Sequence, residues 1–201
     1  MNFKKIVNLT ICSFGIQFGS ALQMANMSSI YTFLGASATY LNFLWLAGPI
    51  TGLLVQPLIG QLSDNSRSRF GRRRFYMLLM AILAFISLMW MPNVSGLWTA
   101  AALLWLLDTS NNGVALPFRA LITETTKPTE RTTAFAWQAL FSGLGATVAA
   151  LSPWLALHLF GVSMDATTAS GKIPLAIKWA FYLGAWAFLL MTTWTVFSVK
   201  E

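Results

Sequence analysis

Three polar residues in the stretch DTSNNGVALPFR have types and a spacing that suit chemistry inside a membrane. Asn112 and Arg119 follow Asp108 at four and eleven residues, so a helix places all three on one face. The window Leu97–Leu116 is mostly apolar and has the roughly 20 residues that a helix needs to span a bilayer core of about 30 Å. Asp108 then lies near the midplane, where an ionised carboxylate costs at least ~2.5 kcal/mol and must face protein or water.

Gly113 and Pro117 loosen the same helix, because a proline cannot donate the backbone hydrogen bond to the carbonyl four residues before it. A polar, interrupted segment inside a spanning helix is typical of a transport site. The alternative for Asp108 is a structural bridge between helices. Its depth, and the amides of Asn111 and Asn112 beside it, favour a functional role. The alternative for Arg119 is that it only extends its side chain to water, because it lies about 16 Å along the helix from Asp108.

The composition identifies the class of protein. The chain is 56% hydrophobic and 9% charged, which excludes an ordinary soluble domain and indicates a multi-pass membrane protein. The net charge of +7 comes from bases in the loops between apolar segments, so we expect no nucleic-acid partner. One histidine, one cysteine and six scattered acids form no metal site and no nucleophile constellation. We therefore expect no metal, no cofactor and no enzymatic activity.

The elements that must position these residues are six apolar segments, which form one bundle over residues 1–201. The expected spans are roughly 6–34, 41–62, 75–91, 97–118, 134–160 and 175–199. If consecutive loops alternate between the two sides of the membrane, eleven of the 13 Lys and Arg lie on the same side as the N-terminus. This bias predicts that both termini are cytoplasmic and that the bundle lies in a plasma or inner membrane. The segments GPITGLLVQP and GLGATVAALSP, in spans two and five, faintly suggest a 3+3 inverted repeat.

Several motifs spread over residues 15–124 carry a family resemblance. The loop that runs from GQLSD to RFGRRR resembles the loop between the second and third helices of the major facilitator superfamily. Together with WLAGPITGLLVQPLIGQLSD before it, this loop is similar to sucrose–proton symporters, which are of the glycoside–pentoside–hexuronide:cation type. GIQFGSALQMAN resembles that family's first helix, and LPFRALITE resembles its fourth. In that family a membrane aspartate precedes the arginine of the fourth helix by eleven residues, as Asp108 precedes Arg119. The sequence departs from the family after this arginine, where the family has Asp and this chain has Thr123 and Glu124.

The resemblance implies an all-α fold that is the N-terminal half of a major facilitator transporter, completed by a second six-helix bundle. It also implies import of a sugar, such as the disaccharides sucrose or maltose, with a proton as the coupling ion. Asp108 is then the proton-coupling residue. The candidate substrate-binding residues are Arg119, Asn112, Asn111, Gln17 and Gln138. The candidate cytoplasmic gate consists of Asp64, Arg69, Gly71, Arg72, Arg73 and Arg74.

Each of these assignments has a plainer alternative. The arginine-rich loop also serves as a topology signal, which explains most of its charge. Gln17 and Gln138 lie on short polar stripes of the kind that often hold membrane helices together. The bundle as a whole suits a non-transporting membrane sensor or assembly subunit, or a transporter of another small solute. The sequence leaves open whether sodium takes the place of the proton as the coupling ion.

The charge bias yields a test of the topology. Reporters fused at Ser66 or Lys127 should be cytoplasmic and one at Asp165 external, because the positively charged loops stay on the cytoplasmic side. The measurement is the activity of a fused reporter that is active on one side of the membrane alone. A cytoplasmic signal at Asp165 would contradict the six-span topology.

Overall fold

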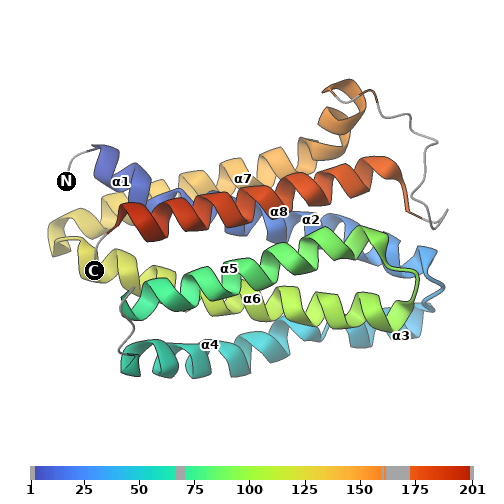
Figure 1. Cartoon of the computed structure of the whole chain (residues 1–201), viewed down its shortest axis with the longest axis horizontal. Coiled ribbons are helices and arrows are strands. Elements are labelled where there is room, and N and C mark those ends of the chain that lie inside the picture. Colours follow the sequence, from blue (N-terminus) through green and yellow to red (C-terminus); the bar gives the residue numbers. More distant parts are fainter. Residues whose placement is uncertain (1–2, 67–70, 160, 162–172, 200–201) are drawn as a thin grey trace.

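The computed structural model describes residues 3–66, 71–159, 161 and 173–199, and its elements there are α-helices and short 3₁₀ turns. The all-α prediction is therefore confirmed for the described part of the chain. The elements are α1 (Phe3–Thr10), α2 (Cys12–Phe33), α3 (Ala38–Leu44), α4 (Ala47–Asn65), α5 (Arg72–Trp90), η1 (Met91–Asn93), α6 (Leu97–Thr125), η2 (Pro128–Glu130), α7 (Arg131–Leu159) and α8 (Leu175–Ser198) (Figure 1).

These elements form long rods that run side by side. α1 and α2 make the first rod and α3 and α4 the second, so each of the first two expected spans contains a break in its helix. α1 begins and α8 ends at one end of the bundle, called here the terminus end (Figure 1). α3 and the start of α8 lie at the opposite end, called here the far end.

Five stretches of the described residues are long and apolar enough to cross a membrane: Phe3–Phe33, Leu41–Asn65, Arg72–Asn93, Pro128–His158 and Leu175–Ser198. The remaining long helix, α6, has 29 residues, but it is not among these five stretches because its polar residues lower its mean hydropathy. α6 is one continuous helix with Pro117 inside it, so the proline does not break it in this structure. It also continues past the expected end of its span at 118, to Thr125.

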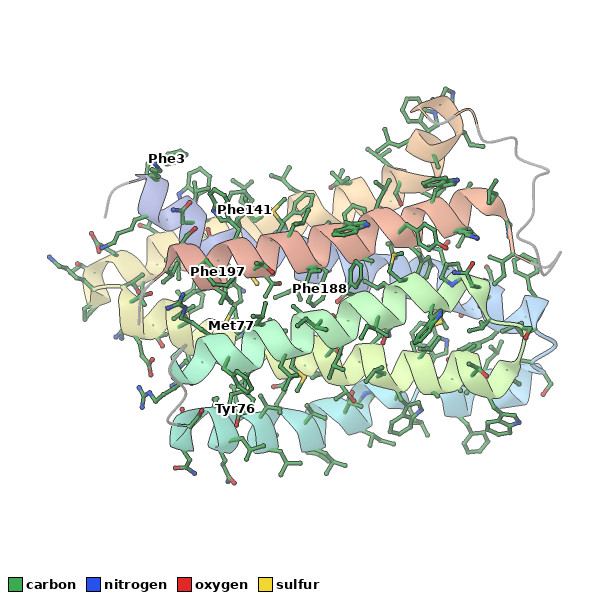
Figure 2. All side chains as sticks on the ribbon, in the orientation of Figure 1. Phe3, Tyr76, Met77, Phe141, Phe188 and Phe197 are labelled. Atoms are coloured by element: carbon green, nitrogen blue, oxygen red, sulfur yellow. The ribbon has the colours of Figure 1, made fainter. Side chains whose placement is uncertain are left out.

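The core lies where the rods meet. α2 packs against α7 and α8, α5 packs against α6 and α8, and α4 packs against α6. Met77 of α5 and Phe188 of α8 are fully buried between the helices, whereas Phe3 lies at the outer edge (Figure 2). α6 is thus held between α4 and α5, which places its polar face inside the bundle.

Glycines allow α2 to lie close to both of its neighbours. A Cβ atom added at Gly145 of α7 would collide with the backbone carbonyl oxygen of Phe14 in α2. One added at Gly15 of α2 would lie 2.7 Å from the carbonyl oxygen of Ala187 in α8. Small residues at such crossings let membrane helices approach backbone to backbone, which compensates for the weak hydrophobic drive between helices in lipid.

The Gly145 contact predicts a site-specific loss of stability. Gly145→Ala should destabilise the bundle by about 1–3 kcal/mol, because the clash is with backbone that cannot move aside. Gly143→Ala is the matched control, since the same substitution on the same helix meets nothing within 4 Å. Thermal unfolding in detergent, followed by tryptophan fluorescence, measures both variants. Equal stability of the two would contradict the close α2–α7 packing.

Candidate functional site

The carboxylate of Asp108 is buried and is held on one side. Its Oδ1 accepts a hydrogen bond of 2.7 Å from Nε2 of Gln23 on α2. The amide of Gln23 is itself oriented, because its Oε1 accepts a long bond of 3.5 Å from Asn111 Nδ2. The second oxygen, Oδ2, is buried and has no hydrogen-bond partner among the described residues. It faces α4, where a Cβ atom added at Gly48 would lie 3.8 Å away.

Asn112 joins α6 to α4. Its Nδ2 donates to Thr51 Oγ1 at 3.1 Å and to the backbone carbonyl of Asp108 at 3.0 Å. Its Oδ1 accepts from Gln56 Nε2 at 2.7 Å. The Asn112 amide therefore uses both of its donors and one acceptor position within the bundle. Sequence reasoning found Asn112 but had no means to find Thr51 and Gln56, which lie on another helix.

Arg119 lies on a separate cavity between α2, α6 and α7. The cavity has a volume of about 140 Å³ and is lined by Ser13, Ile16, Gln17, Ala115, Phe118, Arg119, Gln138 and Ser142. Three of the predicted substrate residues thus converge here, from three helices. Asn111 and Asn112 are not part of the lining, and Asp108 bonds to Gln23 instead of pairing with Arg119.

Some polar groups of this cavity have no hydrogen-bond partner among the described residues. Arg119 is exposed and has no hydrogen bond or ion pair within the described part of the chain. Gln138 Oε1 is buried and likewise has no partner there. Ser13, which sequence reasoning missed, donates from Oγ to the Gln138 backbone carbonyl at 3.0 Å. Its position four residues before Gln17 was the available signal, because that spacing places both on one helix face.

An ion-pair cluster closes the terminus end of α4, α5 and α6. Arg73 of α5 is almost fully buried and donates from Nε and Nη2 to the two carboxylate oxygens of Glu124, at 3.0 and 2.6 Å. Its Nη2 also lies 3.0 Å from Asp64 Oδ1 at the end of α4. Bidentate arginine–carboxylate pairs are among the stronger polar contacts in proteins. The sequence analysis proposed Asp64 and Arg73 for a gate but did not include Glu124.

Three of the other predicted gate residues, Gly71, Arg72 and Arg74, lie at the start of α5 beside Arg73. Gly71 has a φ of +100°, in the region that favours glycine, and precedes the first turn of α5 that carries Arg73. Arg74 donates from Nε to the backbone carbonyl of Val196 near the end of α8. The positive charge of Arg72 acts on Glu124. Arg69 lies outside the described residues.

Comparison with known proteins identifies the family. Residues 9–201 match the model of the Major Facilitator Superfamily. The chain belongs to this superfamily. It is therefore an integral, multi-pass membrane protein, as its apolar helices also indicate. The predicted family resemblance and the all-α membrane fold class are confirmed.

Relatives narrow the similarity within the superfamily. The chain is 33% identical to the sucrose transport protein SUC3 of Arabidopsis thaliana over 98% of its own length and 36% of that protein. It is 31% identical to SUC4 of the same plant, covering 89% of the chain and 38% of SUC4. It is 29% identical to SUT2 of rice, Oryza sativa, over 98% of the chain and 44% of SUT2. The chain thus spans less than half the length of these sucrose transport proteins.

Acid should weaken the Arg73–Glu124 pair, whose carboxylate lies beyond the expected span at 97–118. The hydrogen bond from Arg73 lowers the pKa of Glu124 below its ordinary 4.5, burial opposes this, and the charges of Arg73 and Arg72 add to the lowering. The stability contributed by the pair is therefore fully present above pH 4.5, and it is lost as pH falls through the lower pKa of the folded state.

The variant Glu124→Gln tests this dependence. This variant should be less stable than the wild type at neutral pH and should lose less stability on acidification. The measurement is thermal unfolding from neutral pH to below pH 4.5. Asp64→Asn is the control, because it removes one contact and keeps the bidentate pair. If Glu124→Gln loses as much stability in acid as the wild type, the pair is not the acid-sensitive contact.

Proposed function

We propose that this chain is one bundle of a secondary transporter that imports a sugar, such as sucrose or maltose, together with a proton. The observation that carries the proposal is the joint presence of two sites on α6. One is a buried carboxylate with an open oxygen at Asp108. The other is a polar cavity at Arg119 that faces α2 and α7. The similarity to sucrose transport proteins supports a sugar as the substrate.

Asp108 is the proposed proton site. Gln23 holds Oδ1, so the proton binds at Oδ2, which has no other partner in the described structure. Protonation removes the carboxylate charge within the membrane, and deprotonation restores it. Inward movement of one proton releases about 2.3 kcal/mol per 100 mV of membrane potential. That free energy is enough to concentrate a neutral sugar severalfold.

Arg119 is the proposed sugar-binding residue. Its planar guanidinium donates two parallel hydrogen bonds, which suits a pair of neighbouring sugar hydroxyls. Gln17 and Gln138 add amides that both donate and accept, and the open Oε1 of Gln138 accepts from a hydroxyl. Asn111 and Asn112 are proposed to act indirectly, since they hold Gln23 and α4 around Asp108.

A second six-helix bundle is proposed as the other wall of the sugar site. The cavity of about 140 Å³ is smaller than the ~300 Å³ typical of a pocket that encloses a small molecule. Among the five spanning stretches, Leu41–Asn65 and Pro128–His158 are also the least covered: in an apolar segment of 18 residues in each, 28% and 22% of the residues are buried, against 56% in Phe3–Phe33. This second bundle is a C-terminal half or another copy of the chain.

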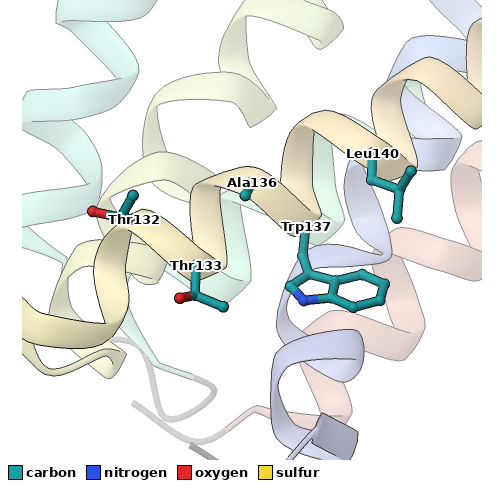
Figure 3. Close-up of a pocket in the computed structure, with 5 residues that line it drawn as sticks. All are labelled: Thr132, Thr133, Ala136, Trp137 and Leu140. Carbon is teal, nitrogen blue, oxygen red and sulfur yellow. The ribbon is translucent and has the colours of Figure 1, made fainter.

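The outward face of α7 suits such a partner. A hollow of about 340 Å³ follows this face and is lined by Thr132, Thr133, Ala136, Trp137 and Leu140 (Figure 3). Most of these side chains are small, and small residues let two membrane helices approach closely. Gly143 continues the exposed face by one turn, and a Cβ atom added there would meet nothing within 4 Å. A helix of the second bundle is proposed to pack here.

The ion-pair cluster is the proposed gate on the cytoplasmic side. Arg73 ties α5 to α4 through Asp64 and to α6 through Glu124. Alternating access rocks one bundle against the other around a fixed site, so contacts at one end must form and break. Arg72 and Arg74, in the first turn of α5, supply further positive charge at the same end.

Two variants separate coupling from recognition in the chain assembled with its second bundle. Asp108→Asn keeps the shape of the side chain but cannot exchange a proton, so it should lose uphill accumulation and retain sugar binding. Arg119→Lys should weaken sugar binding severalfold or more, because an ammonium cannot reproduce the planar fork. The measurement is uptake of labelled sucrose or maltose into proteoliposomes, with and without an imposed proton gradient.

The outcomes that contradict the proposal are distinct. An Asp108→Asn protein that still concentrates sugar against its gradient shows that the carboxylate is structural. Uphill uptake by the chain as a purified monomer removes the need for a second bundle. Sugar binding with no uptake in any assembly favours a membrane sensor built on the same fold.

A further inference from the structure

A groove at the far end of the bundle takes no part in the proposed transport site. It has a volume of about 340 Å³, lies between α5 and α8, and is lined by Phe85, Ile86, Met89, Trp90, Asn93 and Tyr182. Three of its lining residues are aromatic, and one of them, Phe85, meets the ring of Trp186 edge to face at 5.0 Å. The groove opens on the outward sides of two spanning helices, where Trp90 and Trp186 are exposed.

The outer end of this groove is polar. The ammonium of Lys178 lies 5.6 Å from the centre of the Tyr182 ring. Asn93 Nδ2 donates to the Tyr182 hydroxyl oxygen at 2.9 Å, so the hydroxyl accepts from the protein and keeps its own hydrogen to donate. An ammonium and a hydroxyl donor are thus placed one helical turn apart, beside an apolar groove.

No carboxylate of the described residues lies near Lys178. Among the described residues it is the one cation at the far end of the bundle, since the others lie on α1, the start of α5, the second half of α6 and the η2–α7 turn. The described acids Asp64, Glu124 and Glu130 lie at the terminus end, and Asp108 lies mid-helix on α6. Trp90 and Trp179 lie at the same end of the bundle as Lys178. Tryptophans are enriched in membrane proteins at the level of the lipid headgroups. This lysine therefore presents a positive charge at headgroup level, next to an apolar groove.

We propose that the groove binds an anionic phospholipid. The phosphate accepts hydrogen bonds from the Lys178 ammonium and the Tyr182 hydroxyl, and one acyl chain lies along Phe85, Ile86 and Met89. The apolar groove fits the chain, and the unpaired positive charge fits a headgroup with net negative charge. The lipid would bridge α5 and α8, which the protein itself joins at this end through the Asn93–Tyr182 bond.

Native mass spectrometry of the purified full chain tests this site. Phosphatidylglycerol and phosphatidylcholine are added separately to the detergent-solubilised protein, and the lipids retained per chain are counted. The wild type should retain phosphatidylglycerol severalfold better than phosphatidylcholine. Lys178→Ala should remove this preference, and Lys178→Arg should keep it because the charge remains. Ile86→Trp should reduce retention by filling the groove, whereas Leu53→Trp, on an exposed face of α4, should not.

Two results would overturn the proposal. Equal retention of both lipids by the wild type shows that the headgroup charge is not recognised. Undiminished phosphatidylglycerol binding in Lys178→Ala and Ile86→Trp shows that the lipid binds elsewhere. A second readout applies to protein that stays folded by circular dichroism: phosphatidylglycerol with brominated acyl chains should quench tryptophan fluorescence, and less so in Trp186→Phe.

Discussion

The buried carboxylate of Asp108 is the constraint on which the centre of this bundle depends. A charge buried among membrane-spanning helices must be satisfied by polar groups of the protein or by water in a cavity. Gln23 supplies that contact from α2, and Asn112 ties the same turn of α6 to α4. α4 packs directly against these two side chains: a Cβ atom added at Gly48 would lie 3.8 Å from Asp108, and one added at Gly52 would lie 3.5 Å from Asn112, which are ordinary contact distances. Three helices are thereby positioned around one acid.

α6 connects the three polar regions of the chain. Asp108, Arg119 and Glu124 lie on this single helix of 29 residues, at the carboxylate site, the cavity and the ion-pair cluster. Arg119 is about 16 Å from Asp108 along the axis and Glu124 about 8 Å further. A shift or rotation of one rigid helix therefore moves all three regions together. Under the proposed function, this is a direct physical route by which proton binding, sugar binding and gating can be linked.

The site residues show how far sequence reasoning reached. Asp108 was identified because a charge within an apolar span can be recognised from the sequence alone. Arg73 was identified because the sequence places it in an arginine-rich segment beside one acid. Asn112 was expected to support Arg119, since both lie on one helix face. The structure instead shows Asn112 bonded to Thr51 and Gln56 of α4, two helical turns along α6 from Arg119. Face alone does not determine a partner; depth along the helix matters as well.

The sequence by itself determined the membrane class, the apolar rods and the family, because these depend on composition, on apolar runs of spanning length and on local motifs. It also placed Asp108 and Arg119 eleven residues apart. The tertiary structure alone decided that Gln23 holds Asp108, that Glu124 completes the Arg73 cluster, and that Ser13 joins the cavity of Arg119. Each of these contacts joins two different helices. They depend on the rotation and depth of one helix relative to another, which close approaches such as Gly145 to Phe14 determine and no single segment encodes.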